Sequence, residues 1–132
     1  MTRFDGMAAA FLVDDVGATA RWYRDVLGFV FDTFPQAEPF EWASLRRGRA
    51  EVMLQRSPGY RKPDLDPLRP GGAWNAYFYV DDADALFATL DKRASVRRAP
   101  CDQPYRMREF EIADPNGYVL VFGQDLSGQD TE

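Results

Sequence analysis

The segment Phe11-Leu-Val-Asp-Asp15 returns as Phe78-Tyr-Val-Asp-Asp82 about half a chain length later. In both places a short apolar run ends in two aspartates and then enters an amphipathic stretch. An aspartate at such a junction can accept hydrogen bonds from the free N–H groups at the start of a helix. The repeat therefore predicts two modules of one kind, each with a strand that leads directly into a helix.

The two amphipathic stretches have the periodicity of helices with one buried face. In the first stretch the apolar positions are Val16, Ala20, Tyr23 and Leu27. Gly28 follows them, which predicts a C-terminal cap for this helix. In the second stretch the apolar positions are Ala83, Leu86, Phe87, Leu90 and Ala94. We expect one helix through each set of positions.

Each predicted helix is followed by three runs that read as strands. The runs are Phe29–Thr33, Glu41–Arg46 and Ala50–Gln55 in the first module, and Val96–Arg98, Met107–Ala113 and Tyr118–Gly123 in the second. Asp114-Pro-Asn-Gly117 is a strong hairpin signal, and Arg47-Gly48 is a weaker one. The predicted fold class is α+β: tandem βαβββ modules forming a concave mixed β-sheet with helices on the outer face.

A segment rich in proline and glycine separates the two modules. Between Ser57 and Gly72 the chain has four prolines and three glycines, a composition that resists both helix and strand. With 132 residues, 45% of them hydrophobic, the chain is long enough for one globular domain. We therefore expect a single domain over residues 1–132, with module one at about 6–56, a linker at about 57–73 and module two at about 74–125.

The composition excludes several classes of function. The chain has no histidine, which rules out Ser-His-Asp and Cys-His nucleophile arrangements and imidazole metal ligands. Lys+Arg 16 and Asp+Glu 21 give a net charge of −5, which argues against nucleic acid and anionic membrane surfaces as partners. An acidic protein is better suited to neutral or cationic partners.

The cysteine content and the N-terminus indicate a location. Cys101 is the only cysteine, so no disulfide can form within the chain, and this usage fits a reducing cytosol. The first apolar run, Met7–Val13, is too short to span a membrane and lacks a following cleavage signature. We expect a soluble, cytoplasmic protein.

Two segments carry a resemblance to a known family. One is Arg21-Trp-Tyr-Arg-Asp-Val-Leu-Gly-Phe29, and the other runs from Met107-Arg-Glu-Phe110 through Asp114-Pro-Asn-Gly-Tyr-Val-Leu-Val-Phe122. With the tandem βαβββ pattern, they resemble the vicinal oxygen chelate superfamily of glyoxalases, extradiol dioxygenases and bleomycin-resistance proteins. The resemblance is closest to the bleomycin-resistance-like branch.

The resemblance also implies where metal ligands would lie. Metal-dependent members carry four ligands on the first and last strands of the modules, and the matching positions here are Ala8, Met53, Asn75 and Val121. None of these is a carboxylate, imidazole or thiolate, the groups that hold divalent cations well. If the register of the 50–55 strand were shifted by two residues, Glu51 or Gln55 would take the ligand position. One carboxylate and one amide would still hold a metal poorly. We expect no metal, no cofactor and no catalytic residue.

Strand alternation assigns side chains to the two faces of the sheet. Phe78, Phe110 and Ile112 are expected to face the helices, which turns their sequence neighbours to the concave face. Trp42 is placed there by analogy. The predicted ligand-binding residues are Trp42, Asn75, Tyr77, Tyr79, Met107, Glu109 and Glu111. Aromatic rings and carboxylates together favour a flat aromatic or cationic ligand.

Structural roles would also explain these residues. Tyr77 or Tyr79 would serve equally in a dimer interface or the core, and Glu109 and Glu111 are well placed in sequence to pair with Arg106 or Arg108.

Three functions follow from the residues and the resemblance. The first is a small-molecule binding protein that acts by sequestration, without a metal and as a homodimer, as the resemblance to bleomycin-resistance proteins implies; its ligand would be drug-like, and a bleomycin-type antibiotic is one candidate. The second is a glyoxalase- or dioxygenase-type enzyme with an atypical site and Glu109 or Glu111 as base. The third is a non-catalytic metabolite-binding module. The residues favour a protein that is not an enzyme.

Overall fold

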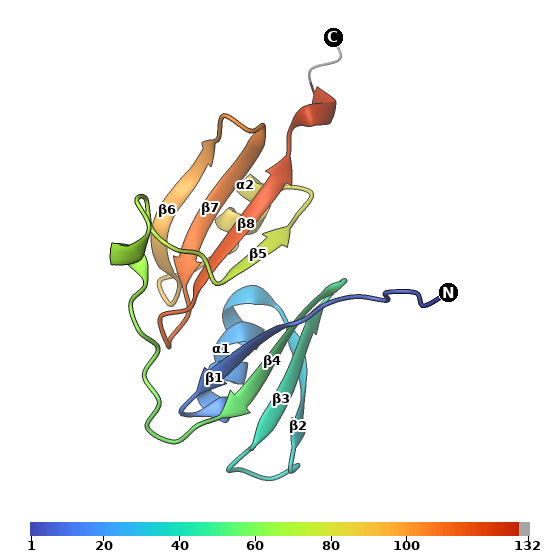
Figure 1. Ribbon diagram of the computed structural model, residues 1–132, viewed down its shortest axis with the longest axis vertical. Coiled ribbons are helices and arrows are strands. Elements are labelled where there is room, and N and C mark those ends of the chain that lie inside the picture. Colours follow the sequence, from blue (N-terminus) through green and yellow to red (C-terminus); the bar gives the residue numbers. More distant parts are fainter. Residues whose placement is uncertain (130–132) are drawn as a thin grey trace. The chain divides into compact units, whose positions relative to one another are not determined.

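The computed structural model describes residues 1–129. The chain divides into two compact units, the first ending at Lys62 and the second beginning at Pro63, and each contains one four-stranded sheet (Figure 1). The strand orders are β1-β4-β3-β2 and β5-β8-β7-β6, which is the same order for two successive modules. The predicted α+β fold of two βαβββ modules is confirmed, with each module forming its own sheet.

The first unit consists of β1 (Ala9–Val13), α1 (Val16–Leu27), β2 (Val30–Phe34), β3 (Trp42–Arg47) and β4 (Ala50–Arg56). As predicted, Asp15 caps α1 by accepting a 3.0 Å hydrogen bond from the N–H of Ala18, and Gly28 ends it with a left-handed φ of 71°. β1 is parallel to β4, and the other pairs are antiparallel, so the sheet is mixed.

The second unit consists of η1 (Asp66–Leu68), β5 (Ala76–Tyr79), α2 (Ala83–Ala88), β6 (Ser95–Asp102), β7 (Met107–Ala113), β8 (Val119–Asp125) and η2 (Ser127–Gln129). Asp82 caps α2 as Asp15 caps α1. The predicted turn between β7 and β8 is confirmed, because Asp114 accepts hydrogen bonds from the N–H groups of Asn116 and Tyr118.

Two elements of the second unit differ in length from the expectation. The helix ends at Ala88 rather than continuing through Leu90 to Ala94, because the Thr89 hydroxyl donates to the carbonyl of Leu86 and a turn at Asp91 follows. β6 is longer than the predicted Val96–Arg98, since it pairs with β7 as far as Asp102 through two register shifts. Several other strand ends differ by one or two residues.

In each unit the helix covers one face of the sheet, and the core lies between them (Figure 1). In the first unit the buried side chains include those of Phe11, Leu45 and Leu54. In the second, Phe110 and Phe122 stack with ring centroids 4.9 Å apart. Since side chains alternate along a strand, the residues between these core positions lie on the opposite face of the sheet. None of the helices in residues 1–129 is long and apolar enough to cross a membrane.

Candidate functional site

Glu109 lies at the centre of the face of the second sheet that α2 does not cover. It is on β7, next to the core residue Phe110 in sequence, and its neighbour in register on β8 is Gly123. Its carboxylate is fully buried, at 0% exposure. The Tyr77 hydroxyl donates a 2.7 Å hydrogen bond to Oε2, and the Tyr105 hydroxyl donates another of 2.7 Å to Oε1. Both carboxylate oxygens therefore accept a hydrogen bond from a phenol hydroxyl.

No arginine or lysine within residues 1–129 lies within 4.0 Å of the Glu109 carboxylate. Arg106 and Arg108, the partners suggested by sequence proximity, bond elsewhere: Arg106 to the carbonyl of Ser127, and Arg108 to Asp84 and Asp102. A buried carboxylate normally has a cationic partner. Here two phenol O–H groups stabilise it instead, and such bonds to an ionised oxygen are short and strong.

Glu111, two residues further along β7, has a different environment. It is 3% exposed, accepts a 3.2 Å hydrogen bond from the indole N–H of Trp74, and pairs with Arg98 of β6 at 3.5 Å. Its charge is therefore balanced within the protein. Of the two carboxylates on this face, Glu109 is the one without a cation.

Tyr77 is held firmly in place. Its ring contacts those of Trp74 and Tyr79, with centroids 5.4 and 5.2 Å away. To reach Glu109 on β7 from β5, its side chain crosses the intervening strand β8 above Gly123, where a Cβ would overlap with the hydroxyl. Glycine at position 123 is thus a requirement for the bond between Tyr77 and Glu109.

The environment of Glu109 raises the pKa of both phenols. For Tyr105 the pKa rises from 10.0 to about 12, because burial disfavours the phenolate and the hydroxyl donates a hydrogen bond to the Glu109 carboxylate. For Tyr77 the same two causes raise the pKa further. Both phenols consequently remain hydrogen-bond donors at neutral pH.

The structure brings together most of the predicted ligand-binding residues. Tyr77, Glu109 and Glu111 are in mutual contact or joined through Trp74, and Tyr79 lies beside Tyr77 with 82% of its surface exposed. Met107 is half-buried at the start of β7.

Asn75 has a structural role, since its side-chain oxygen accepts a hydrogen bond from the N–H of Val119 at 2.8 Å. Trp42 lies on the other sheet, paired with Gln55 and Phe34.

Four residues in or around this site, Trp74 among them, were not predicted from the sequence. Tyr105 comes from the hairpin turn between β6 and β7, and Arg98 comes from a strand segment beyond a register shift. Gly123 lies inside a strand, where a glycine often marks the close approach of another group. This glycine could therefore have pointed to the site from the sequence. We refer to Trp74, Tyr77, Tyr79, Tyr105, Glu109 and Glu111 as the tyrosine–carboxylate face.

The residues at the positions of metal ligands do not fit a metal ion. Met53 lies between the buried Val52 and Leu54 on β4, and Val121 is fully buried opposite Tyr77 and Glu111. Alanine, methionine, asparagine and valine side chains at these four positions provide a single amide oxygen, and that amide already accepts a backbone N–H. Over residues 1–129, no three carboxylates or thiols cluster as a metal site would require.

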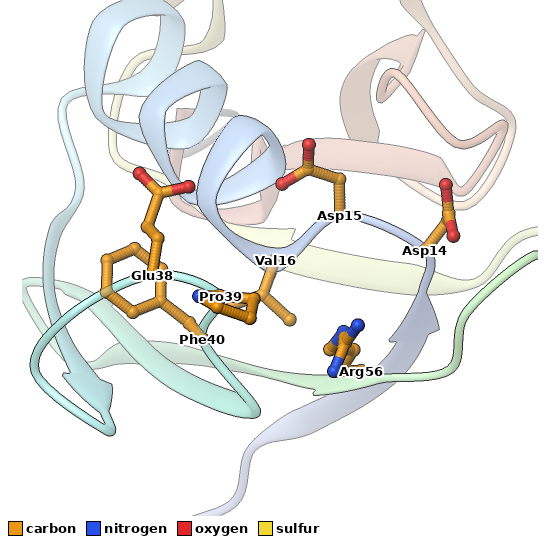
Figure 2. Close-up of a pocket in the computed structure, with 7 residues that line it drawn as sticks. All are labelled: Asp14, Asp15, Val16, Glu38, Pro39, Phe40 and Arg56. Carbon is orange, nitrogen blue, oxygen red and sulfur yellow. The ribbon is translucent and has the colours of Figure 1, made fainter.

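The first unit contains an acidic pocket of about 400 Å³, lined by Asp14, Asp15, Val16, Glu38, Pro39, Phe40 and Arg56 (Figure 2). It opens where the junction of β1 and α1 meets the loop between β2 and β3. Its charged groups already have partners: Asp15 caps α1, Glu38 pairs with Arg21, and Arg56 pairs with Glu41. None of the predicted ligand-binding residues lines this pocket.

Comparisons with known proteins give a family and several similar folds. The sequence model of the Glyoxalase/Bleomycin resistance protein/Dioxygenase superfamily matches residues 7–122. No curated protein matches the chain. Among solved structures, TioX from Micromonospora sp. ML1 is similar with a TM-score of 0.74 and 21% identity, over 93% of this chain and 100% of that one.

Two further structures are similar over nearly their whole length. The bleomycin-binding protein from bleomycin-producing Streptomyces verticillus, in complex with copper(II)-bleomycin, has a TM-score of 0.68 and 23% identity, over 95% of this chain and 98% of that one. A superfamily member from Sphaerobacter thermophilus has a TM-score of 0.65 and 17% identity, over 93% and 98%. At such identities these likenesses show the fold alone.

Proposed function

Since the chain belongs to the glyoxalase/bleomycin resistance protein/dioxygenase superfamily, a fold that hosts unrelated activities, we propose from its own residues that it is a small-molecule binding protein. Its ligand is an organic cation with an aromatic part, and it binds on the tyrosine–carboxylate face. The observation that carries the proposal is Glu109, a fully buried carboxylate without an ion-pair partner in the described chain.

The aromatic residues around Glu109 support the same ligand class. Tyr79 is largely exposed beside Tyr77, and Trp74 is 45% exposed. Exposed rings next to an uncompensated negative charge provide stacking and cation–π contacts for a flat cation. The net charge of −5 favours the approach of such a ligand.

The proposal includes a mode of action. Because the positions of metal ligands hold Ala8, Met53, Asn75 and Val121, binding does not use a metal ion, and the protein acts by sequestering its ligand. A protein of this kind would confer resistance to a drug. The similar protein from Streptomyces verticillus binds copper(II)-bleomycin, which makes a bleomycin-type antibiotic the first drug to test. Our proposal places the protein in the cytoplasm, as a homodimer of single-domain chains.

A thermal-shift screen tests the proposal. A ligand that binds only the folded protein raises its melting temperature, by an amount that grows with concentration. The screen compares bleomycin with and without copper, benzamidine, the neutral benzamide and a series of divalent metals. We expect cationic aromatic compounds to stabilise the protein and benzamide to have little effect. Stabilisation by a metal alone would contradict the proposal, and would favour the enzyme alternative with Glu109 or Glu111 as base.

A further inference from the structure

The two phenols that bond to Glu109 are held very differently. The Tyr77 ring contacts the rings of Trp74 and Tyr79, and its hydroxyl lies directly above Gly123. Tyr105 is 54% exposed, and within residues 1–129 its side chain has no ring contact and only one hydrogen bond, the one to Glu109. Of the two phenols bonded to Glu109, Tyr105 is therefore the one whose side chain moves at the lower cost.

The backbone beneath Tyr105 is fixed, so this motion is a side-chain rotation. A hydrogen bond from the N–H of Arg106 to the carbonyl of Gln103 closes the turn, and the carbonyl of Arg106 accepts the N–H of Leu126. Arg106 has a φ of 65°, which fits the tight return into β7. Exposed side chains change rotamer within nanoseconds, without a change in the fold.

We propose that Tyr105 is a displaceable cover of the binding site: the ligand's cationic N–H group replaces the Tyr105 hydroxyl on Oε1 of Glu109, while Tyr77 remains on Oε2. This inference rests on the proposed function and defines its ligand more narrowly. Glu109 is fully buried, so a ligand reaches it only if a covering side chain moves. Of the two phenols bonded to Glu109, Tyr105 has the fewer contacts.

The exchange selects the ligand by its hydrogen-bond donors. If the Tyr105 hydroxyl leaves, Oε1 needs another donor, because an unsatisfied buried acceptor is costly. An ammonium or amidinium N–H restores the bond and adds opposite charge, which makes it stronger than the bond it replaces. A quaternary ammonium ion has the charge but no N–H. We therefore infer that the ligand carries a primary amine, amidine or guanidine attached to an aromatic body.

The environment directs this cation to Glu109 and away from Glu111. Glu111 is already paired with Arg98, whose positive charge repels a second cation. Oε2 of Glu109 accepts the hydroxyl of Tyr77, whose ring is held by contacts with Trp74 and Tyr79. Oε1 of Glu109 is thus the acceptor that the ligand can reach.

Calorimetric titration of the full chain with three probes tests the inference: benzamidine, benzyltrimethylammonium and neutral benzamide. Benzamidine should bind most tightly. The decisive variant is Tyr105→Phe, which removes the hydroxyl that competes for Oε1. It should bind benzamidine about threefold to tenfold more tightly than the wild type, the effect of removing one competing hydrogen bond. A residue with a purely structural role would not improve binding when truncated.

Tyr77→Phe is the matched control, since it removes the same atom from the other phenol. The ring keeps its contacts with Trp74 and Tyr79 and stays in place, so affinity for benzamidine should not increase. Glu109→Gln should reduce benzamidine affinity at least tenfold, and thermal unfolding checks that each variant is folded. Equal binding of benzamidine and benzyltrimethylammonium, with no gain in Tyr105→Phe, would overturn the inference and leave the proposed function standing. Failure of all three probes to bind would overturn both.

Discussion

The hydroxyl of Tyr77 lies in the space that a Cβ at Gly123 would occupy. This relationship allows a side chain on β5 to reach across β8 and bond to Glu109 on β7. A glycine inside a central strand, which costs stability by itself, is thereby explained by the group that passes above it. The geometry of the tyrosine–carboxylate face depends on this one missing side chain.

Gly123→Ala should lower the free energy of unfolding by about 1–3 kcal/mol, because the added methyl group forces Tyr77 away from Glu109. Gly128→Ala is the matched control, since nothing lies within 4 Å of a Cβ there, and it should change stability by less than about 0.5 kcal/mol. Denaturant unfolding measures both. Equal stabilities for the two variants would mean that Tyr77 does not occupy this position.

Tyr105 and Tyr77 should titrate above the usual range for tyrosine in an alkaline titration followed by phenolate absorbance. The pKa of Tyr105 is raised to about 12, and that of Tyr77 is raised as well. A pKa that is higher in the folded than in the unfolded state stabilises the fold fully below the unfolded pKa of about 10, and this contribution is lost as the pH rises through the folded pKa. The stability should therefore decrease above pH 10.

Two variants, Tyr105→Phe and Glu109→Gln, show which tyrosines account for the late part of this titration. The first variant should lose one late-titrating tyrosine. The second should move the late tyrosines toward lower pH, because the carboxylate no longer holds their protons, although burial still raises their pKa. A wild-type titration curve for Glu109→Gln would contradict the hydrogen bonds to this carboxylate.

Tyr79→Ala should weaken binding of an aromatic cation by about 0.5–2 kcal/mol if the ring lies against the ligand. The loss should be similar at low and high salt, because stacking is not screened as charge attraction is. Stability should change little, since the side chain is 82% exposed. Trp42→Ala, on the other sheet, tests in the same calorimetric experiment whether that predicted residue also contributes. Wild-type affinity in Tyr79→Ala would remove Tyr79 from the site.

Metal analysis provides an independent prediction. Protein incubated with zinc, nickel, manganese or iron and then desalted should contain only trace metal, because the positions of the family's ligands are occupied by Ala8, Met53, Asn75 and Val121. One firmly bound metal ion per chain would show that other donors form a site.

Local and periodic features were predictable from the sequence. The repeat around Phe11 and Phe78 predicted the two modules, and the two capping aspartates are where the pattern placed them. Alternation along β7 placed Glu109 and Glu111 on the face opposite Phe110, because the side-chain period of a strand is fixed at two.

Features that depend on distant contacts were not predictable. The burial of Glu109 results from Tyr105, a turn residue, and from Tyr77, which crosses a strand to reach it. The partner of Glu111 is Arg98, brought into place by a register shift in β6 rather than by proximity in sequence. The early end of α2 reflects the side chain of Thr89, which competes for a backbone carbonyl.

The most direct test of the proposed site is a titration of nitrogen-labelled protein with benzamidine, followed in the amide NMR spectrum. We expect shifts at Tyr77, Glu109 and Gly123 and at the indole N–H of Trp74, with none at Val16 or Phe40 of the acidic pocket. Glu109→Gln should lose these shifts, whereas Glu41→Gln, which removes an equal charge from an exposed pair with Arg56, should retain them. Shifts centred on the acidic pocket, or unchanged binding in Glu109→Gln, would contradict the account.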